Sequence, residues 1–193
     1  MYKNILIPII AAMTIIFTLS SHTLADCKNA KDHLNKASNY AKMGEYNLAI
    51  KNAQKAIKIN DEFSEAYYLM GLSYNAMGNY EQAIDNLNKA IQFEINTAQT
   101  YYLLGSAYCA TGNYDLAIKN LEKSLEIDSN YKDSYNMLGL AYISDGKHEK
   151  GIENLNKAMD LKNTTYETYH LLGLAYLSLN QYEKAIENLE KSV

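Results

Sequence analysis

The sequence of 193 residues contains no arginine and no tryptophan, and its only proline is Pro8. Proline removes a helical hydrogen-bond donor and clashes with the preceding turn, so a chain without it after residue 8 suits long uninterrupted helices. All 18 cationic side chains are lysines, and 22 aspartates and glutamates leave a net charge of −4. Phosphate-rich ligands favour basic stripes and bidentate arginine contacts. The composition therefore argues against nucleic acid as a partner.

Cysteine is scarce as well, since only Cys27 and Cys109 are present. Two widely separated cysteines are not the framework that staples small secreted domains, so we expect two unpaired thiols. The four histidines include no pair four residues apart and no neighbouring carboxylate cluster, so no metal site is expected. No glycine-rich phosphate loop occurs, and one Ser-x-x-Lys match, at Ser129, lacks its companion motifs. We expect neither a cofactor nor enzymatic activity.

The N-terminus has the pattern of a targeting segment. Lys3 and the terminal amine provide a positive start, residues 5–19 form an apolar run, and residues 23–25 approximate a small-x-small cleavage pattern. The pattern predicts a signal peptide over residues 1–25. The exported protein, periplasmic or secreted, would then begin at Asp26.

Two membrane-associated alternatives stay open. The apolar run of about 15 residues could remain as an anchor, although roughly 20 are needed to span a bilayer. Residues 24–27 resemble the box at which bacterial lipoproteins are acylated on cysteine, which here would be Cys27. Asp26 departs from that box, because a small uncharged residue normally precedes the cysteine.

Beyond the N-terminus the sequence repeats itself every 34 residues without a gap, which is typical of a solenoid. Glycines at 44, 78, 112 and 146 mark the period, and Asn180 follows at the same spacing. Tyrosines recur in the same register at 40, 74, 108, 142 and 176. Tyr67, Met70, Gly71 and Tyr74 share one helical stripe, which predicts a buried face. A single helix pair cannot bury such a face, so neighbouring units must stack.

Residues 67–74, with Gly78-Asn79-Tyr80 and Ala83 after them, resemble the tetratricopeptide repeat family, whose 34-residue unit is a pair of antiparallel helices. The resemblance implies an all-α fold, a right-handed solenoid of antiparallel helix pairs. A short lead (26–29) would precede the repeat domain (30–193), whose units are 30–63, 64–97, 98–131, 132–165 and 166–193. The proline that usually follows the second helix is absent. Polar turn chemistry replaces it, and the Thr164–Glu167 spacing predicts a capping box.

The resemblance also implies a concave groove on the first helices, lined by the fifth, ninth and twelfth residues of each unit among others. Family members that grip a terminal carboxylate use lysine, arginine or asparagine at the fifth and ninth positions. No basic residue stands there in this sequence, so we expect an apolar client segment instead. Packing between neighbouring first helices explains Tyr68, Leu72 and Tyr102 equally well. The candidate groove residues are Leu34, Tyr68, Leu72, Tyr102, Ser106, Cys109, Asn136, Leu140, Ile143, His170 and Leu174.

These observations favour an exported scaffold that binds a protein or peptide client in its groove. A composition rich in asparagine, lysine, isoleucine and tyrosine favours a bacterial source, and an exported bacterial scaffold would work in a cell-envelope assembly. The alternative is a self-assembling structural protein. Its first unit has polar residues such as Lys36 on its outer face, whereas Ile186, Leu189 and Val193 leave an apolar C-terminal edge, which predicts weak homo-oligomers.

Overall fold

The computed structural model describes residues 26–162 and 164–193, and this part of the chain consists of helices joined by short turns. The signal peptide expected over residues 1–25 lies outside the described residues. A first helix is described over residues 26–42, so the expected lead of four residues is helical. The following helices are α2 (Tyr46–Ile59), α3 (Ser64–Ala76), α4 (Tyr80–Gln92), α5 (Ala98–Ala110), α6 (Tyr114–Ile127), α7 (Lys132–Ser144), α8 (His148–Asp160), α9 (Tyr166–Ser178) and α10 (Tyr182–Lys191).

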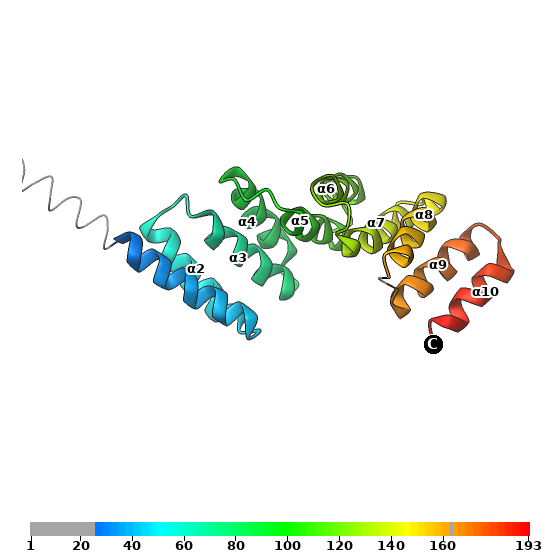
Figure 1. The fold of residues 1–193 in the computed structure, drawn as a ribbon, viewed down its shortest axis with the longest axis horizontal. Helices are drawn as coiled ribbons and strands as arrows, with labels where there is room; N and C mark the ends of the chain where they lie inside the picture. Colours follow the sequence, from blue (N-terminus) through cyan, green and yellow to red (C-terminus); the bar gives the residue numbers. More distant parts are fainter. Residues whose placement is uncertain (1–25, 163) are drawn as a thin grey trace, which may run out of the picture.

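The helices form pairs that succeed one another along the long axis of the molecule, as the colour gradient of Figure 1 shows. The first helices of successive units contact one another, α3 with α5, α5 with α7 and α7 with α9. Among the described helices, no two second helices from α2 to α10 are in contact. The first helices therefore line the inner side of the stack. This arrangement confirms the expected all-α solenoid of helix pairs.

The turn inside each unit explains the glycine period. Gly44, Gly78, Gly112 and Gly146 have φ angles of 76–77°, a left-handed conformation that glycine adopts without steric cost. Asn180, at the same position of the fifth unit, has φ 58°. Asparagine is among the residues that tolerate this region, which explains the replacement.

At the start of α4, Asn79 occupies the N-cap position, but its side chain makes no capping hydrogen bond. The expectation about the cap of α9 is wrong. The capping box before α9 is formed by Thr165 and Thr168 instead of Thr164 and Glu167. The N-cap is thus one residue later than the sequence spacing suggested.

Close approach of the two helices within a unit sets the core. Leu121 of α6 is completely buried and packs against Gly105 of α5, where an added Cβ would lie 2.6 Å from the leucine Cγ. The same glycine–leucine pair recurs in the second, fourth and fifth units with the same distance. A side chain at the glycine position would therefore push the two helices apart. Within residues 26–162 and 164–193, no helix is both long and apolar enough to cross a membrane.

A candidate binding groove on the first helices

The residues expected to line a concave groove all lie on first helices, and none of them is buried. Three of them, Tyr102, Asn136 and Leu140, line one cavity of about 370 Å³. This cavity, here called the inner groove, is built by α5, α7 and the start of α9. Its other lining residues are Asp133, Met137, Thr165, Glu167 and Leu171.

The remaining candidates do not line the inner groove. Leu34 packs against the core cluster of the first two units. Cys109 packs against the cluster around Leu121 and Leu138, and burial raises the pKa of its thiol to about 11. Leu34 and Cys109 therefore pack within the protein instead of lining the groove. Tyr68, Leu72, Ser106 and Ile143 are half-buried outside the lining, and His170 and Leu174 are exposed.

Polar side chains hold neighbouring first helices in register around the inner groove. The Thr168 hydroxyl donates a hydrogen bond to Asn136 Oδ1 at 3.1 Å, which connects α9 to α7. Asn75 Nδ2 likewise donates to the carbonyl oxygen of Leu103 at 2.9 Å, which connects α3 to α5. Asn136 is thus both a lining residue and a structural link, and a substitution there would disturb both roles.

Two tyrosine rings lie near Asp133 of the inner groove. The rings of Tyr102 and Tyr131 have centroids 5.5 Å apart. Burial, followed by the charge of Asp133, raises the pKa of both phenols, that of Tyr131 to about 12. The hydroxyls therefore remain protonated at neutral pH. Hydrogen bonds from Tyr166 and Thr165 lower the pKa of Glu167, so this second carboxylate is ionised.

Sequence reasoning missed the acidic part of this lining. Asp133 and Glu167 are the second residues of their units, a position that also faces the groove in the family. Met137 and Leu171 each follow a fifth-position residue, Asn136 and His170. The repeat register could have indicated these positions. The extent to which two neighbouring helices diverge and open a cavity is a tertiary property that the register does not contain.

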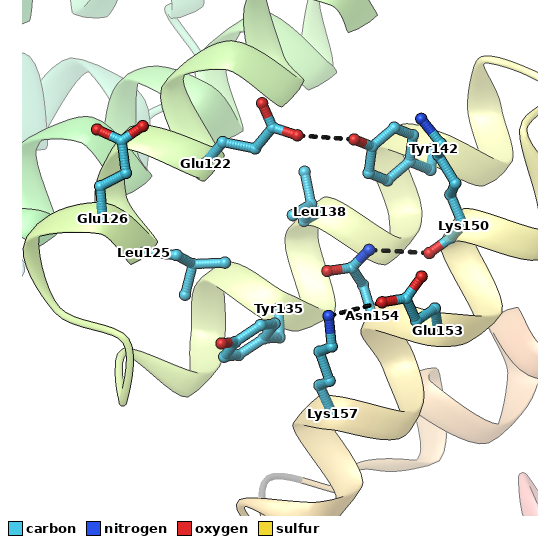
Figure 2. A pocket seen from close by; sticks show the side chains of 10 residues that line it. All are labelled: Glu122, Leu125, Glu126, Tyr135, Leu138, Tyr142, Lys150, Glu153, Asn154 and Lys157. Atoms are coloured by element: carbon cyan, nitrogen blue, oxygen red, sulfur yellow. Dashed lines mark hydrogen bonds and ion pairs between the residues drawn. The ribbon is translucent and has the colours of Figure 1, made fainter.

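A second cavity, here called the outer pocket, opens between α6, α7 and α8 and has a volume of about 440 Å³ (Figure 2). Its floor is Leu138 with Tyr135 and Tyr142 of α7. Side chains of α6 and α8 form its walls (Figure 2). These are Glu122, Leu125, Glu126, Lys150, Glu153, Asn154 and Lys157.

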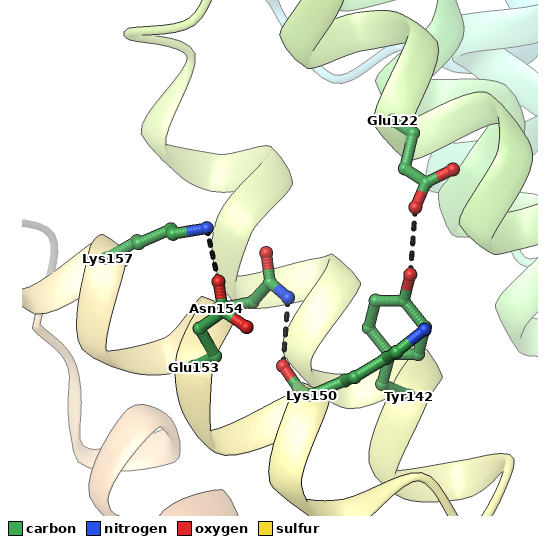
Figure 3. A network of polar contacts seen from close by, with 6 residues as sticks. All are labelled: Glu122, Tyr142, Lys150, Glu153, Asn154 and Lys157. Atoms are coloured by element: carbon green, nitrogen blue, oxygen red, sulfur yellow. Dashed lines mark hydrogen bonds and ion pairs between the residues drawn. The ribbon is translucent and has the colours of Figure 1, made fainter.

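Much of the outer pocket's polar surface is already engaged within the protein (Figure 3). Tyr142 donates a hydrogen bond to Glu122 at 2.8 Å, and burial with this bond raises the tyrosine pKa to about 12. Lys157 pairs with Glu153 at 2.7 Å, and the ammonium of Lys150 lies 5.5 Å from the Tyr142 ring centroid. The outer pocket is larger than the inner groove. Its polar groups nevertheless already bond to one another and connect α6 to α7. The inner groove is therefore the better candidate for a binding site.

Comparison with known proteins places the chain in a family. Models described as "Tetratricopeptide repeat" match residues 96–164 and 133–193, 52–85 and 33–63, and one described as "TPR repeat" matches residues 71–110. No curated protein matches the sequence significantly.

Solved structures agree with this family. MamA protein is 27% identical over 86% of this chain and 90% of its own, with a TM-score of 0.77. MamA 41-end from Desulfovibrio magneticus RS-1 is 26% identical over 85% and 93%, with a TM-score of 0.78. YrrB, described as a TPR protein with an unusual peptide-binding site, has the same fold at 21% identity over 91% and 90%, with a TM-score of 0.76. The chain therefore belongs to the tetratricopeptide repeat family.

Proposed function

We propose that this protein is a non-catalytic scaffold that holds a segment of another protein in the inner groove. The observation that carries the proposal is the apolar lining that three consecutive first helices bring together. Tyr102, Met137, Leu140 and Leu171 converge on one cavity of about 370 Å³ at the inner side of the stack. Cavities near 300 Å³ and above accommodate ligand groups, and aromatic and aliphatic side chains are the usual anchors.

Peptide selection tests whether the protein binds extended segments. Short random peptides displayed on phage are selected on the purified full chain. We expect enrichment of peptides rich in aliphatic and aromatic residues. Enriched peptides should compete with one another, because one groove holds them all. A selection that enriches no competing set would contradict the proposal.

We also propose that the scaffold is exported and works in a bacterial cell-envelope assembly. The support is the positive start, apolar run and small-x-small pattern of residues 1–25. The intact mass of protein recovered from its own cells should correspond to a chain that starts at Asp26. A mass that includes residues 1–25 would indicate an anchor. An added diacylglycerol on Cys27 would indicate a lipoprotein.

Self-association is a second candidate, because the two edges of the stack differ. Ile186 of α10 is 58% exposed, whereas Ile50 and Ile118, at the same repeat position, are buried between units. At the opposite edge, Asp32 and Lys36 are exposed where inner units bury Ala66 and Met70. Head-to-tail stacking would bury these charges, which is costly. We therefore propose a two-fold dimer in which two α10 faces meet.

The edge residue for a test is Ile186, because Leu189 packs against Gly173 of its own unit. Leu189 is nevertheless less covered than its equivalents, as expected: it is half-buried, whereas Leu87, Leu121 and Leu155 at the same repeat position are completely buried. Ile186→Lys should shift a concentration-dependent dimer to monomer in analytical ultracentrifugation. Ile127→Lys, at a residue 43% exposed at the end of α6, is the matched control and should leave the dimer unchanged. An unmodified protein that remains monomeric at high concentration would refute the dimer.

A further inference from the structure

From the second unit onward, positive charge is distributed unevenly between the two helices of each unit. The second helices α2, α4, α6, α8 and α10 each carry at least one lysine. Among the first helices from α3 onward, α3, α5 and α9 carry none, and α7 carries only Lys132 at its first position. From the second unit onward, the inner side of the stack is therefore poor in lysine, and the inner groove has no lysine in its lining.

The lining of the inner groove combines two carboxylates with aromatic and aliphatic groups. Asp133 and Glu167 stand at the starts of α7 and α9 and line the same cavity as Tyr102, and the charge of Asp133 acts on the Tyr102 phenol. Carboxylates favour cations, and the face of a tyrosine ring attracts a cation placed over it. Leu140 and Leu171 add an apolar surface directly next to these groups.

Acidic residues in the first turn of a helix also stabilise that helix, because they interact favourably with its dipole. Glu65 is in the first turn of α3, at the same repeat position as Asp133 and Glu167, without lining the inner groove. A carboxylate offers about four acceptor sites, so contacts within the protein and an ion pair to a ligand can coexist. Asp133 and Glu167 can therefore both interact with the helix dipole and bind a ligand. Glu65 interacts with a helix dipole but does not line the inner groove, so it serves as a control.

From this arrangement we infer that the segment held in the inner groove carries a lysine or arginine next to an aliphatic side chain. The aliphatic group lies against Leu140 and Leu171, and the cation lies between Asp133 and Glu167 near the Tyr102 ring. This inference rests on the proposed function, because it names the chemistry of the segment for the same groove. It adds a charged contact to the mainly apolar binding expected from the sequence.

Three synthetic peptides test the inference. They share the aliphatic core of a peptide selected on the protein, and one flanking position is lysine, glutamine or glutamate. We expect the lysine peptide to bind roughly fivefold to tenfold more tightly than the glutamine peptide at low salt, and the glutamate peptide to bind weakest. The difference should shrink at physiological salt, since exposed charges are screened. Fluorescence anisotropy with the purified full chain gives the affinities.

Variants of the carboxylates test whether Asp133 and Glu167 cause the preference for the lysine peptide. Asp133→Asn combined with Glu167→Gln should abolish the preference for lysine, whereas Glu65→Gln should preserve it. Equal affinity of all three peptides for the unmodified protein would overturn the inference and leave the groove as an apolar binding site. A lysine preference that survives the double variant would also overturn it, because the cation would then bind elsewhere. Binding that does not involve the inner groove at all would refute the proposed function itself.

Discussion

Replacing Leu121 with alanine should lower the free energy of unfolding by about 2–5 kcal/mol, because the side chain is completely buried. Leu121 fills the space opposite Gly105 and belongs to the cluster that joins α6 to Leu138 and Tyr142 of α7. Its truncation leaves a cavity both within the third unit and between the third and fourth units. Urea denaturation followed by circular dichroism measures the loss.

Leu116→Ala is the matched control, because Leu116 lies on the same helix and is 43% exposed. Its effect should stay within about 0.5 kcal/mol. Gly105→Ala should also destabilise the protein, and by less in the Leu121→Ala background, where the colliding side chain is gone. A loss below about 1 kcal/mol for Leu121→Ala would mean that stacking of the units does not depend on this leucine.

Replacing Tyr102 with alanine should weaken binding of a selected peptide by more than about tenfold. Tyr102 contributes the aromatic wall of the inner groove, and truncation of a central aromatic anchor typically costs about 2 kcal/mol or more. Because apolar contacts are little screened, the affinity of a neutral peptide should change only modestly between low and physiological salt. Isothermal titration calorimetry with the full chain gives both comparisons.

Tyr101→Ala is the control for this prediction. Tyr101 is the preceding residue on α5, and its hydroxyl donates to Asn96 away from the groove lining. Tyr102 also packs against the core cluster around Leu121, so circular dichroism must show that the variant is folded. Leu140→Ala, whose side chain lies outside that cluster, should weaken binding as well. Unchanged affinity in both folded groove variants would assign these residues to packing alone.

The fold was predictable because every unit repeats the same pattern of glycine, tyrosine and apolar residues. Units predicted to start at residues 64, 98, 132 and 166 have their first helices starting at Ser64, Ala98, Lys132 and Tyr166. Glycine at the left-handed turn and at the helix crossing fixes both the bend and the approach of each pair. Repetition over several units turns weak local preferences into a definite register.

The site was only partly predictable. The register identified Tyr102, Asn136 and Leu140, because the family's groove positions lie on the inner side of the stack. It could not separate these residues from Leu34 and Cys109, which also occupy expected groove positions and pack against core clusters but do not line the cavity. The distinction depends on how far neighbouring units diverge, and no residue pattern within one unit encodes that separation.

Methyl NMR locates a bound peptide and so tests directly whether the inner groove is the binding site. A selected peptide is titrated into the full chain with labelled Met, Leu and Ile methyl groups. Binding in the inner groove predicts that the largest shifts occur at Met137, Leu140 and Leu171, and that Leu125 and Leu138 of the outer pocket shift little. Shifts concentrated at Leu125 and Leu138, with the groove signals unchanged, would contradict it.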